Sequence, residues 1–342
     1  MPVSKMRPKS AVTAVDVARR AGVSIATVSR VMHRTVNVSE DVSARVLEAV
    51  AELGYVPHSA ARSLAQGKTT TIGLLLPEIG VDFFLPMFRG IESAAREAGY
   101  DLLIATQSPV EPRKPSRCPL GQHNTDGLLI FTDNVDAAEL SRLHGQGFPV
   151  VLLYNSSPGG LDIPYVTIEN RAGARQVIDH LIEVHGRRHI ALLTGPSGNE
   201  DSHRRELGYK ESLAAHGIPF DPALVASGEF REQPARAAVE RWLSQGLDFD
   251  AIFACDDDSA GGALLALTGA GKNVPGEVSL VGFDDTLVSR YFNPPLTTVH
   301  APTERVGQEA VRQLVSLMTA GKAEPAVLLP TELVIRQSCG CA

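Results

Sequence analysis

Residues 13–32 read TAVDVARRAGVSIATVSRVM, and this stretch determines the fold of the N-terminal part of the chain. Thr13 followed three residues later by Asp16 is typical of a helix N-cap with an acidic first turn. Gly22 is expected to end this helix, and Ser24 to cap a second helix that starts at residue 25. Two short helices joined through a glycine turn predict a helix-turn-helix.

The surrounding residues extend this motif to a small head of three helices. A third helix is predicted from residue 39 to about residue 53, along which valines recur at helical spacing. Residues 1–70 carry 10 Lys/Arg against 5 Asp/Glu, whereas the rest of the chain carries 22 against 34. A basic head on an acidic body favours contact with a polyanion such as DNA. A three-helix module that packs on a protein would show the same helix pattern.

The second helix of a helix-turn-helix lies in the major groove, and its N-terminal residues reach the base edges. Ile25 and Ala26 can offer apolar contact to a thymine methyl group, whereas Arg30 can bind guanine through two hydrogen bonds. Thr27 and Ser29 are placed for phosphate contacts. We therefore expect Arg30 to carry most of the base readout.

A linker follows the head. Pro57 can begin a short helix that Gly67 ends, with Ala60 and Leu64 on one small apolar side. A helix of this length is marginal in water, so we expect it to form only with a partner or a ligand.

The remainder alternates short apolar runs with helical patterns. The runs cover residues 72–76, 102–105, 128–131, 150–154, 190–194, 251–255 and 279–283. Helical patterns lie near residues 83–98, 136–146, 170–185, 202–216, 234–245, 258–271 and 303–320. Such runs are typical of strands buried on both faces of parallel sheets. The fold class is therefore α/β, with an all-α helix-turn-helix head and a core of two doubly wound parallel sheets.

Ligands of such sheets bind beyond the carboxyl ends of the strands. The candidate residues at those ends are Phe83, Phe84, Tyr154, Asp201, Arg205, Asp256 and Asp284. Aromatic faces, carboxylates and an arginine in one crevice suit a sugar, a sugar acid or a nucleobase-like ring, and we favour a carbohydrate. Asp257 and Asp258 follow the same strand as Asp256, and for them capping of the next helix is the favoured interpretation.

Motifs of enzymes and metal sites are missing from the sequence. It has no GxSxG elbow, HExxH pair or P-loop, so we expect no catalytic residue and no cofactor. His185 and His189 lack a third ligand, and Cys339 and Cys341 have no matching Cys/His pair nearby, so we expect free thiols and no metal.

Length and composition limit the class of protein further. The chain has 342 residues, 44% of them apolar, which predicts two or three ordinary globular domains. No apolar run approaches the roughly 18 residues of a membrane span, and the basic N-terminus lacks the apolar segment of a secretory signal. We therefore expect a cytoplasmic, nucleoid-associated protein with no membrane partner.

Four stretches of the sequence closely resemble the LacI/GalR family of bacterial transcription regulators. They are residues 13–33, 52–64, 69–77 and 278–302, and the resemblance spans nearly the whole chain. It implies a DNA-binding domain at 1–56, a hinge helix and linker at 57–70, and an effector-binding and dimerisation core at 71–342. Within the core it implies an N-terminal subdomain of about 71–167 and 301–326, and a C-terminal subdomain of about 168–300 and 327–342.

The resemblance also implies a mechanism. A homodimeric repressor would bind a pseudo-palindromic operator in double-stranded DNA, and a small effector in the core cleft would change its affinity. Leu64 matches a leucine wedged into the central base step, with Ala60 on the same side of the hinge helix. Phe230 joins the effector-binding set. His33 joins the DNA-binding set, although it stands where the family usually has Asn.

The chain departs from the family pattern after Thr106. Prolines occur at positions 109, 112, 115 and 119, where the family has an amphipathic helix. Prolines at this density cannot form a helix. Residues 107–125 are therefore expected to form an irregular loop, or to stem from a locally altered reading frame.

A second class of function is a cytoplasmic solute-binding or sugar-handling protein whose basic head is incidental. A solute-binding protein for uptake would need an export signal, and an enzyme would need a catalytic set. Neither is visible in the sequence, so a ligand-responsive DNA-binding regulator is the favoured interpretation.

Overall fold

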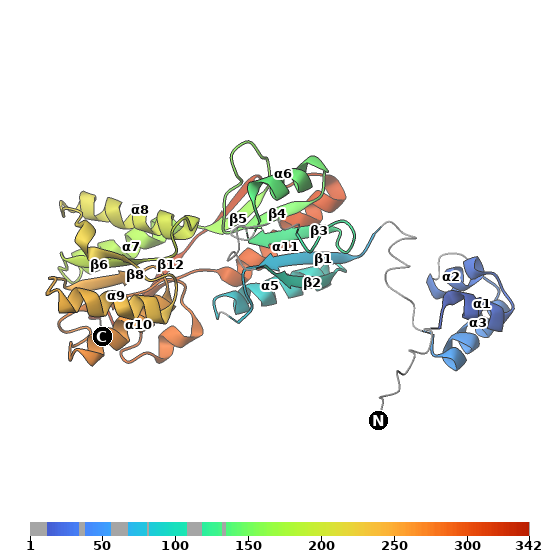
Figure 1. Cartoon of the computed structure of the whole chain (residues 1–342), viewed down its shortest axis with the longest axis horizontal. Helices are drawn as coiled ribbons and strands as arrows, with labels where there is room; N and C mark the ends of the chain where they lie inside the picture. Colours follow the sequence, from blue (N-terminus) through green and yellow to red (C-terminus); the bar gives the residue numbers. More distant parts are fainter. Residues whose placement is uncertain are drawn as a thin grey trace, which may run out of the picture. The chain divides into compact units, whose positions relative to one another are not determined.

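The computed structural model in Figure 1 describes residues 12–33, 38–55, 68–80, 82–107, 118–131 and 135–341. The chain divides into two compact units, Met1–Thr69 and Thr70–Ala342, each of which is described by itself below. Ala60 and Leu64 of the expected hinge helix lie outside the described residues, and so does the side chain of His33. Within the described ranges, no helix combines the length and the apolar character that a membrane span needs.

The first unit contains the three predicted helices, α1 (Ala14–Ala21), α2 (Ile25–His33) and α3 (Glu40–Leu53). The Thr13 backbone N–H donates to Asp16 Oδ2 at 3.0 Å, which closes the expected capping box. Ser24 Oγ accepts from the Thr27 N–H at 3.1 Å and caps α2. Gly22 ends α1 with φ 67°, a left-handed conformation that glycine adopts without strain. The helices enclose a small core of Val17, Ala18, Ala21, Val28, Val46 and Ala49.

The second unit contains two parallel sheets. The first sheet has the order β11-β5-β4-β3-β1-β2. Its strands are β1 (Thr71–Leu76), β2 (Asp101–Thr106), β3 (Gly127–Phe131), β4 (Val150–Leu153), β5 (Tyr165–Ile168) and β11 (Ala326–Leu329). The helices of this N-terminal subdomain are α5 (Phe84–Glu97), α6 (Ala137–Gly145) and α11 (Thr303–Ala320).

The second sheet has the order β7-β6-β8-β9 and forms the C-terminal subdomain. Its strands are β6 (Ile190–Thr194), β7 (Val225–Ser227), β8 (Ala251–Ala254) and β9 (Ser279–Val281). Its helices are α7 (Asn170–Glu183), α8 (Glu200–Ala215), α9 (Glu232–Ser244) and α10 (Asp257–Gly269), with two 3₁₀ turns, η2 (Pro222–Leu224) and η3 (Leu287–Tyr291). Strands β10 (Thr298–His300) and β12 (Glu332–Val334) form an antiparallel pair separate from both parallel sheets. The predicted α/β core with two doubly wound parallel sheets is confirmed.

Two details of the core differ from the expectation. Strand β2 is not buried on both faces, because it is an edge strand that pairs with β1 alone among the described residues. Leu103 and Ile104 are 37% and 39% exposed. Strand β11 pairs with β5 in the first sheet, so the last crossing to the C-terminal subdomain follows Leu329 and not residue 326.

The proline-rich segment is irregular where it is described. Residues 108–117 lie outside the described residues, and residues 118–126 form turns and no helix. Cys118 and Leu120 are buried against α6, and the Cys118 N–H donates to Glu139 Oε1 at 3.1 Å. The end of this segment is therefore packed against the N-terminal subdomain without helical hydrogen bonds.

Candidate functional site

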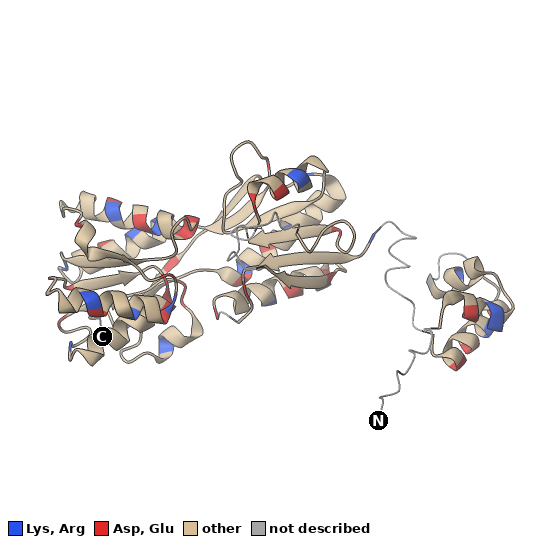
Figure 2. Cartoon of the chain, in the orientation of Figure 1, with Lys and Arg blue, Asp and Glu red and all other residues tan. Residues whose placement is uncertain are grey.

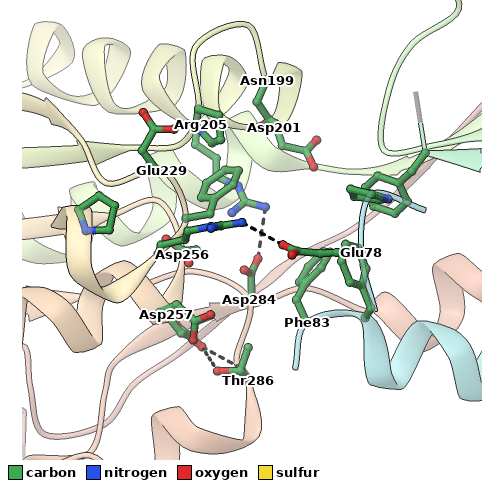
Figure 3. Close-up of a pocket in the computed structure, with 18 of the residues that line it drawn as sticks. Glu78, Phe83, Asn199, Asp201, Arg205, Glu229, Asp256, Asp257, Asp284 and Thr286 are labelled. Carbon is green, nitrogen blue, oxygen red and sulfur yellow. Dashed lines mark hydrogen bonds and ion pairs between the residues drawn. The ribbon is translucent and has the colours of Figure 1, made fainter. Parts of the chain in front are cut away.

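A cavity of about 900 Å³ lies between the two subdomains, where loops from both sheets meet. Its walls follow the carboxyl ends of β1, β3, β6, β8 and β9, as expected for a doubly wound fold. Figure 3 shows the polar side chains that point into it. The predicted residues that line it are Phe83, Phe84, Asp201, Arg205, Phe230, Asp256 and Asp284.

Arg205 lies at the centre of the cavity floor. It projects from α8 and is 2% exposed. Its Nε donates to Asn170 Oδ1 at 2.8 Å, and Nη1 donates to the Cys255 carbonyl oxygen. Nη2 lies 3.3 Å from Asp284 Oδ1, and the guanidinium carbon lies 3.8 Å from the centroid of the Phe283 ring. These contacts fix the planar guanidinium at the floor, where it can donate to a bound ligand.

Three buried carboxyl groups surround this arginine. Burial raises the pKa of Asp201 and Asp256 to about 7 and that of Asp284 to about 6. The Arg205 charge opposes this effect for Asp201 and Asp284. Asp284 Oδ1 accepts no hydrogen bond from the described residues despite its ion pair. These desolvated acceptors would be stabilised by a ligand that supplies hydroxyl groups.

An aromatic wall from the N-terminal subdomain faces this floor. The rings of Phe83 and Phe84 pack edge to face with their centroids 5.4 Å apart. The Phe84 ring packs in the same way on Phe131, with a centroid distance of 5.2 Å. Tyr154 does not line the cavity. Its ring packs behind the wall, 5.4 Å from Phe83 and 5.2 Å from Phe131, and its hydroxyl has no hydrogen-bond partner among the described residues. The wall offers an apolar face on which a ring can stack.

The aspartates after β8 divide their roles differently from the expectation. Asp256, and not Asp257 or Asp258, caps α10, since its Oδ1 accepts from the Ser259 N–H at 3.3 Å. Asp257 instead accepts from the Thr286 N–H at 2.7 Å and thereby holds the loop after β9. Asp256 therefore both caps a helix and lines the cavity.

Three charged residues at the cavity wall, Glu78, Glu229 and Arg231, were not predicted from the sequence. Arg231 Nη2 lies 3.2 Å from Glu78 Oε1 and links the two subdomains (Figure 3). Both side chains are more than half exposed, so the pair contributes at most about 1 kcal/mol. Glu78 comes two residues after β1, a position that the strand-end rule could have identified. Nothing in the sequence points to Arg231.

The head presents the predicted DNA-reading residues on one helix. Ile25 is 52% exposed at the start of α2, and Ala26, Ser29 and Arg30 are exposed as well. Thr27 is half-buried, and its Oγ1 lies 2.9 Å from Ser24 Oγ.

The three head helices are not basic themselves. They carry four Lys/Arg and five Asp/Glu, as the mixed colours in Figure 2 show. The basic excess of residues 1–70 therefore lies in the segments that flank the helices. Electrostatic attraction to DNA would come mainly from those segments, whereas α2 carries the side chains that the sequence predicts for readout.

Comparisons with known proteins agree with this architecture. Residues 13–58 match the model of bacterial regulatory proteins of the lacI family, and residues 178–339 match a periplasmic binding protein-like domain. The transcriptional regulator CelR of Thermobifida fusca is 36% identical over 332 residues, which cover 94% of this chain and 96% of that protein.

Two solved structures extend the similarity to the fold. A CelR–cellobiose complex has a TM-score of 0.70 and 33% identity, and covers 96% of this chain and 99% of that one. A lac repressor dimer bound to operator and the anti-inducer ONPF has a TM-score of 0.82 and 27% identity, with the same coverage. The resemblance seen in the sequence motifs is confirmed: this chain belongs to the LacI/GalR family of DNA-binding transcription regulators.

Proposed function

We propose that the chain is a homodimeric repressor whose affinity for a pseudo-palindromic operator is controlled by a carbohydrate in the cleft. The observation that carries this proposal is the buried pair of Arg205 and Asp284 in a cavity walled by Phe83 and Phe84. A volume of about 900 Å³ is at the upper end of small-molecule sites and suits one or two sugar rings. The cellobiose bound by CelR supports the same ligand class.

Each wall of the cleft has its own role in the proposal. Asp201, Asp256 and Asp284 accept hydrogen bonds from ring hydroxyls, and Arg205 donates to a hydroxyl or ring oxygen. Phe83 and Phe84 cover the apolar face of the ring from one subdomain, and Phe230 does so from the other. Tyr154 acts as support for Phe83.

The head reads the operator in the same proposal. Arg30 hydrogen-bonds to guanine, Ile25 and Ala26 contact a thymine methyl group, and Thr27 and Ser29 contact phosphates. His33 adds a further DNA contact. Ala60 and Leu64 belong to the hinge helix, with Leu64 as the wedge in the minor groove. Two heads related by the dimer axis would bind two half-sites, which is why the operator would be pseudo-palindromic.

Several relatives are named as transcriptional regulators. We infer that this chain likewise has no catalytic activity and acts in the cytoplasm at the nucleoid. The main alternative is a solute-binding or sugar-handling protein with an incidental head. The exposure of α2 argues against this alternative. Ile25 is 52% exposed and does not belong to the core of the head, so its side chain is available to a partner.

Selection from a randomised duplex pool tests the DNA-binding part of the proposal. The full-length chain should enrich a pseudo-palindrome with a central CG step. Bulk binding that depends steeply on salt, with no enriched sequence, would contradict the proposal.

The enriched operator then serves as the probe for effectors. A cognate sugar should change operator affinity by about 5–150-fold. Arg205→Ala should abolish that response, whereas Arg241→Ala, an exposed arginine on α9 outside the cleft, should keep it. A response that survives Arg205→Ala would move the effector site elsewhere.

A further inference from the structure

Two histidines and two cysteines meet in the C-terminal subdomain, away from the cleft. His180 lies in the last turn of α7 and His185 directly after that helix, whereas Cys339 and Cys341 lie after β12. The expectation that these cysteines lack a Cys/His pair is therefore wrong. The fold supplies the histidines from about 160 residues away in the sequence.

The donor atoms are spaced as ligands of one tetrahedral ion would be. Cys341 Sγ lies 3.4 Å from His185 Nε2 and 3.7 Å from His180 Nε2. All four donor atoms of the cluster lie within 4.8 Å of one another. With Zn–S of about 2.3 Å and Zn–N of about 2.0–2.1 Å, a sulfur and a nitrogen ligand in a tetrahedral zinc site are about 3.5 Å apart. An ion would require only small side-chain movements.

The turn that carries the cysteines is fixed to the second sheet. Ser338 Oγ donates to the Leu280 carbonyl oxygen at 2.6 Å, and Ser279 Oγ donates to the Cys339 carbonyl oxygen at 2.7 Å. Thr297 Oγ1 is 3.1 Å from Cys339 Sγ and donates to it. A hydroxyl donor of this kind stabilises a metal-bound thiolate and orients it.

The residue between the two cysteines fits the cluster as well. Gly340 has φ 114°, and a Cβ there would lie 3.0 Å from His185 Nδ1. Glycine therefore allows both the turn and the close approach of the imidazole ring. Any other residue would push the ring away from Cys341 Sγ.

We propose that His180, His185, Cys339 and Cys341 bind one zinc ion as a structural Cys₂His₂ site. Imidazole and thiolate are the ligands that zinc prefers, whereas magnesium and calcium prefer oxygen. Both thiols lose their protons on binding, so the two thiolates neutralise the charge of the ion. The site ties the segment after β12 to α7 and thus stiffens the subdomain that carries Arg205.

Zinc binding by the full-length protein tests this proposal. The protein is reduced, freed of metal with a chelator and titrated with zinc alone. Native mass spectrometry then measures the number of zinc ions bound per chain. We expect one zinc per chain and a Tm that rises with the free zinc concentration. Cobalt in place of zinc should give the absorption of a thiolate-ligated tetrahedral ion in the wild-type protein, a readout that does not depend on any variant.

Variants separate the cluster from other sites. Cys341→Ser and His185→Gln should lose the bound zinc and the zinc-dependent rise in Tm. Cys118→Ser and His189→Gln are matched controls, because neither residue belongs to the cluster. Both variants should keep the bound zinc and the zinc-dependent rise in Tm. His189 Nδ1 lies 2.7 Å from Asp248 instead.

Three results would overturn the proposal. One is a reduced wild-type protein that binds no zinc. Another is a Cys341→Ser variant that still binds one zinc per chain. A third is a Cys339–Cys341 disulfide in the protein as isolated, with no zinc uptake after reduction, which would assign the pair to redox chemistry. None of these readouts involves DNA or a sugar, so the zinc site and the regulatory function can fail separately.

Discussion

Replacing Arg205 by alanine should destabilise the C-terminal subdomain. Arg205 is 2% exposed and forms an ion pair with Asp284, and its charge also acts on Asp201. Removal of one partner of a buried pair costs about 3–5 kcal/mol, because the carboxylates stay buried without a compensating charge. For a folding unit of about 150–250 residues, such a loss corresponds to a fall in Tm of roughly 6–20 °C.

The loss of unfolding free energy in Arg205→Ala should grow as the pH rises. Burial already raises the pKa of Asp284 to about 6 and that of Asp201 to about 7, and Arg205 opposes this, so both pKa values rise further without it. A carboxyl whose pKa is raised by folding binds protons as the chain folds. Its contribution to the free energy of unfolding therefore falls as the pH rises. The difference in unfolding free energy between variant and wild type should be small near pH 5. It should widen above about pH 6, which is the pKa of Asp284.

Urea unfolding followed by tryptophan fluorescence measures this effect. Trp242 is the single tryptophan of the chain, and it is buried in α9 of the same subdomain. Arg205→Lys is the matched variant, since it keeps the charge but not the planar fork, and its loss should depend less on pH. Equal losses of the alanine variant at low and high pH would refute the electrostatic reasoning. The cost would then come from lost packing on Phe283.

Three further changes test other parts of the molecule. Arg30→Ala should cost about 1–3 kcal/mol at a single operator position, measured with operators that differ by one base pair; a uniform loss would make Arg30 a phosphate contact. Leu64→Ala should weaken operator binding more than binding to random DNA, and equal weakening would exclude the wedge. Gly90→Ala should lower the free energy of unfolding by about 1–3 kcal/mol, because its Cβ would lie 2.0 Å from the Glu304 carbonyl oxygen. Gly145→Ala, which has open space, is the control and should not destabilise.

The sequence predicted a strand wherever a continuous apolar run occurs, including the partly exposed edge strand β2. All seven apolar runs became strands, because a continuous run of Val, Ile and Leu has no alternative burial in a doubly wound sheet. The unpredicted strands are β5, β7, β10, β11 and β12. Strands β7, β11 and β12 have mostly half-buried or exposed residues, so no apolar run marks them. Their conformation depends on pairing with distant segments.

The cleft residues were predictable where their position at the end of a strand is enough to place them in the cleft. Arg205 and Asp284 follow from the rule that carboxyl ends of parallel strands face one crevice. Tyr154 follows β4 as well, but it adopts φ 64° and its ring packs behind Phe83. The Cys₂His₂ cluster was not predictable, because His180 is embedded in a helix and reaches Cys341 only through tertiary packing.

The cleft divides its chemistry between the two subdomains, and this division decides which ligands can regulate. Phe83 belongs to the N-terminal subdomain, whereas Arg205 and Asp284 belong to the C-terminal one. A ligand shifts an equilibrium only by its differential affinity for the two arrangements. A sugar that stacks on Phe83 while it hydrogen-bonds to Arg205 favours the arrangement that brings both together. A small polyol that reaches only Arg205 and Asp284 has equal affinity for both arrangements. It should therefore compete with the effector without changing operator affinity. Full regulation by such a fragment would place the coupling within the C-terminal subdomain alone.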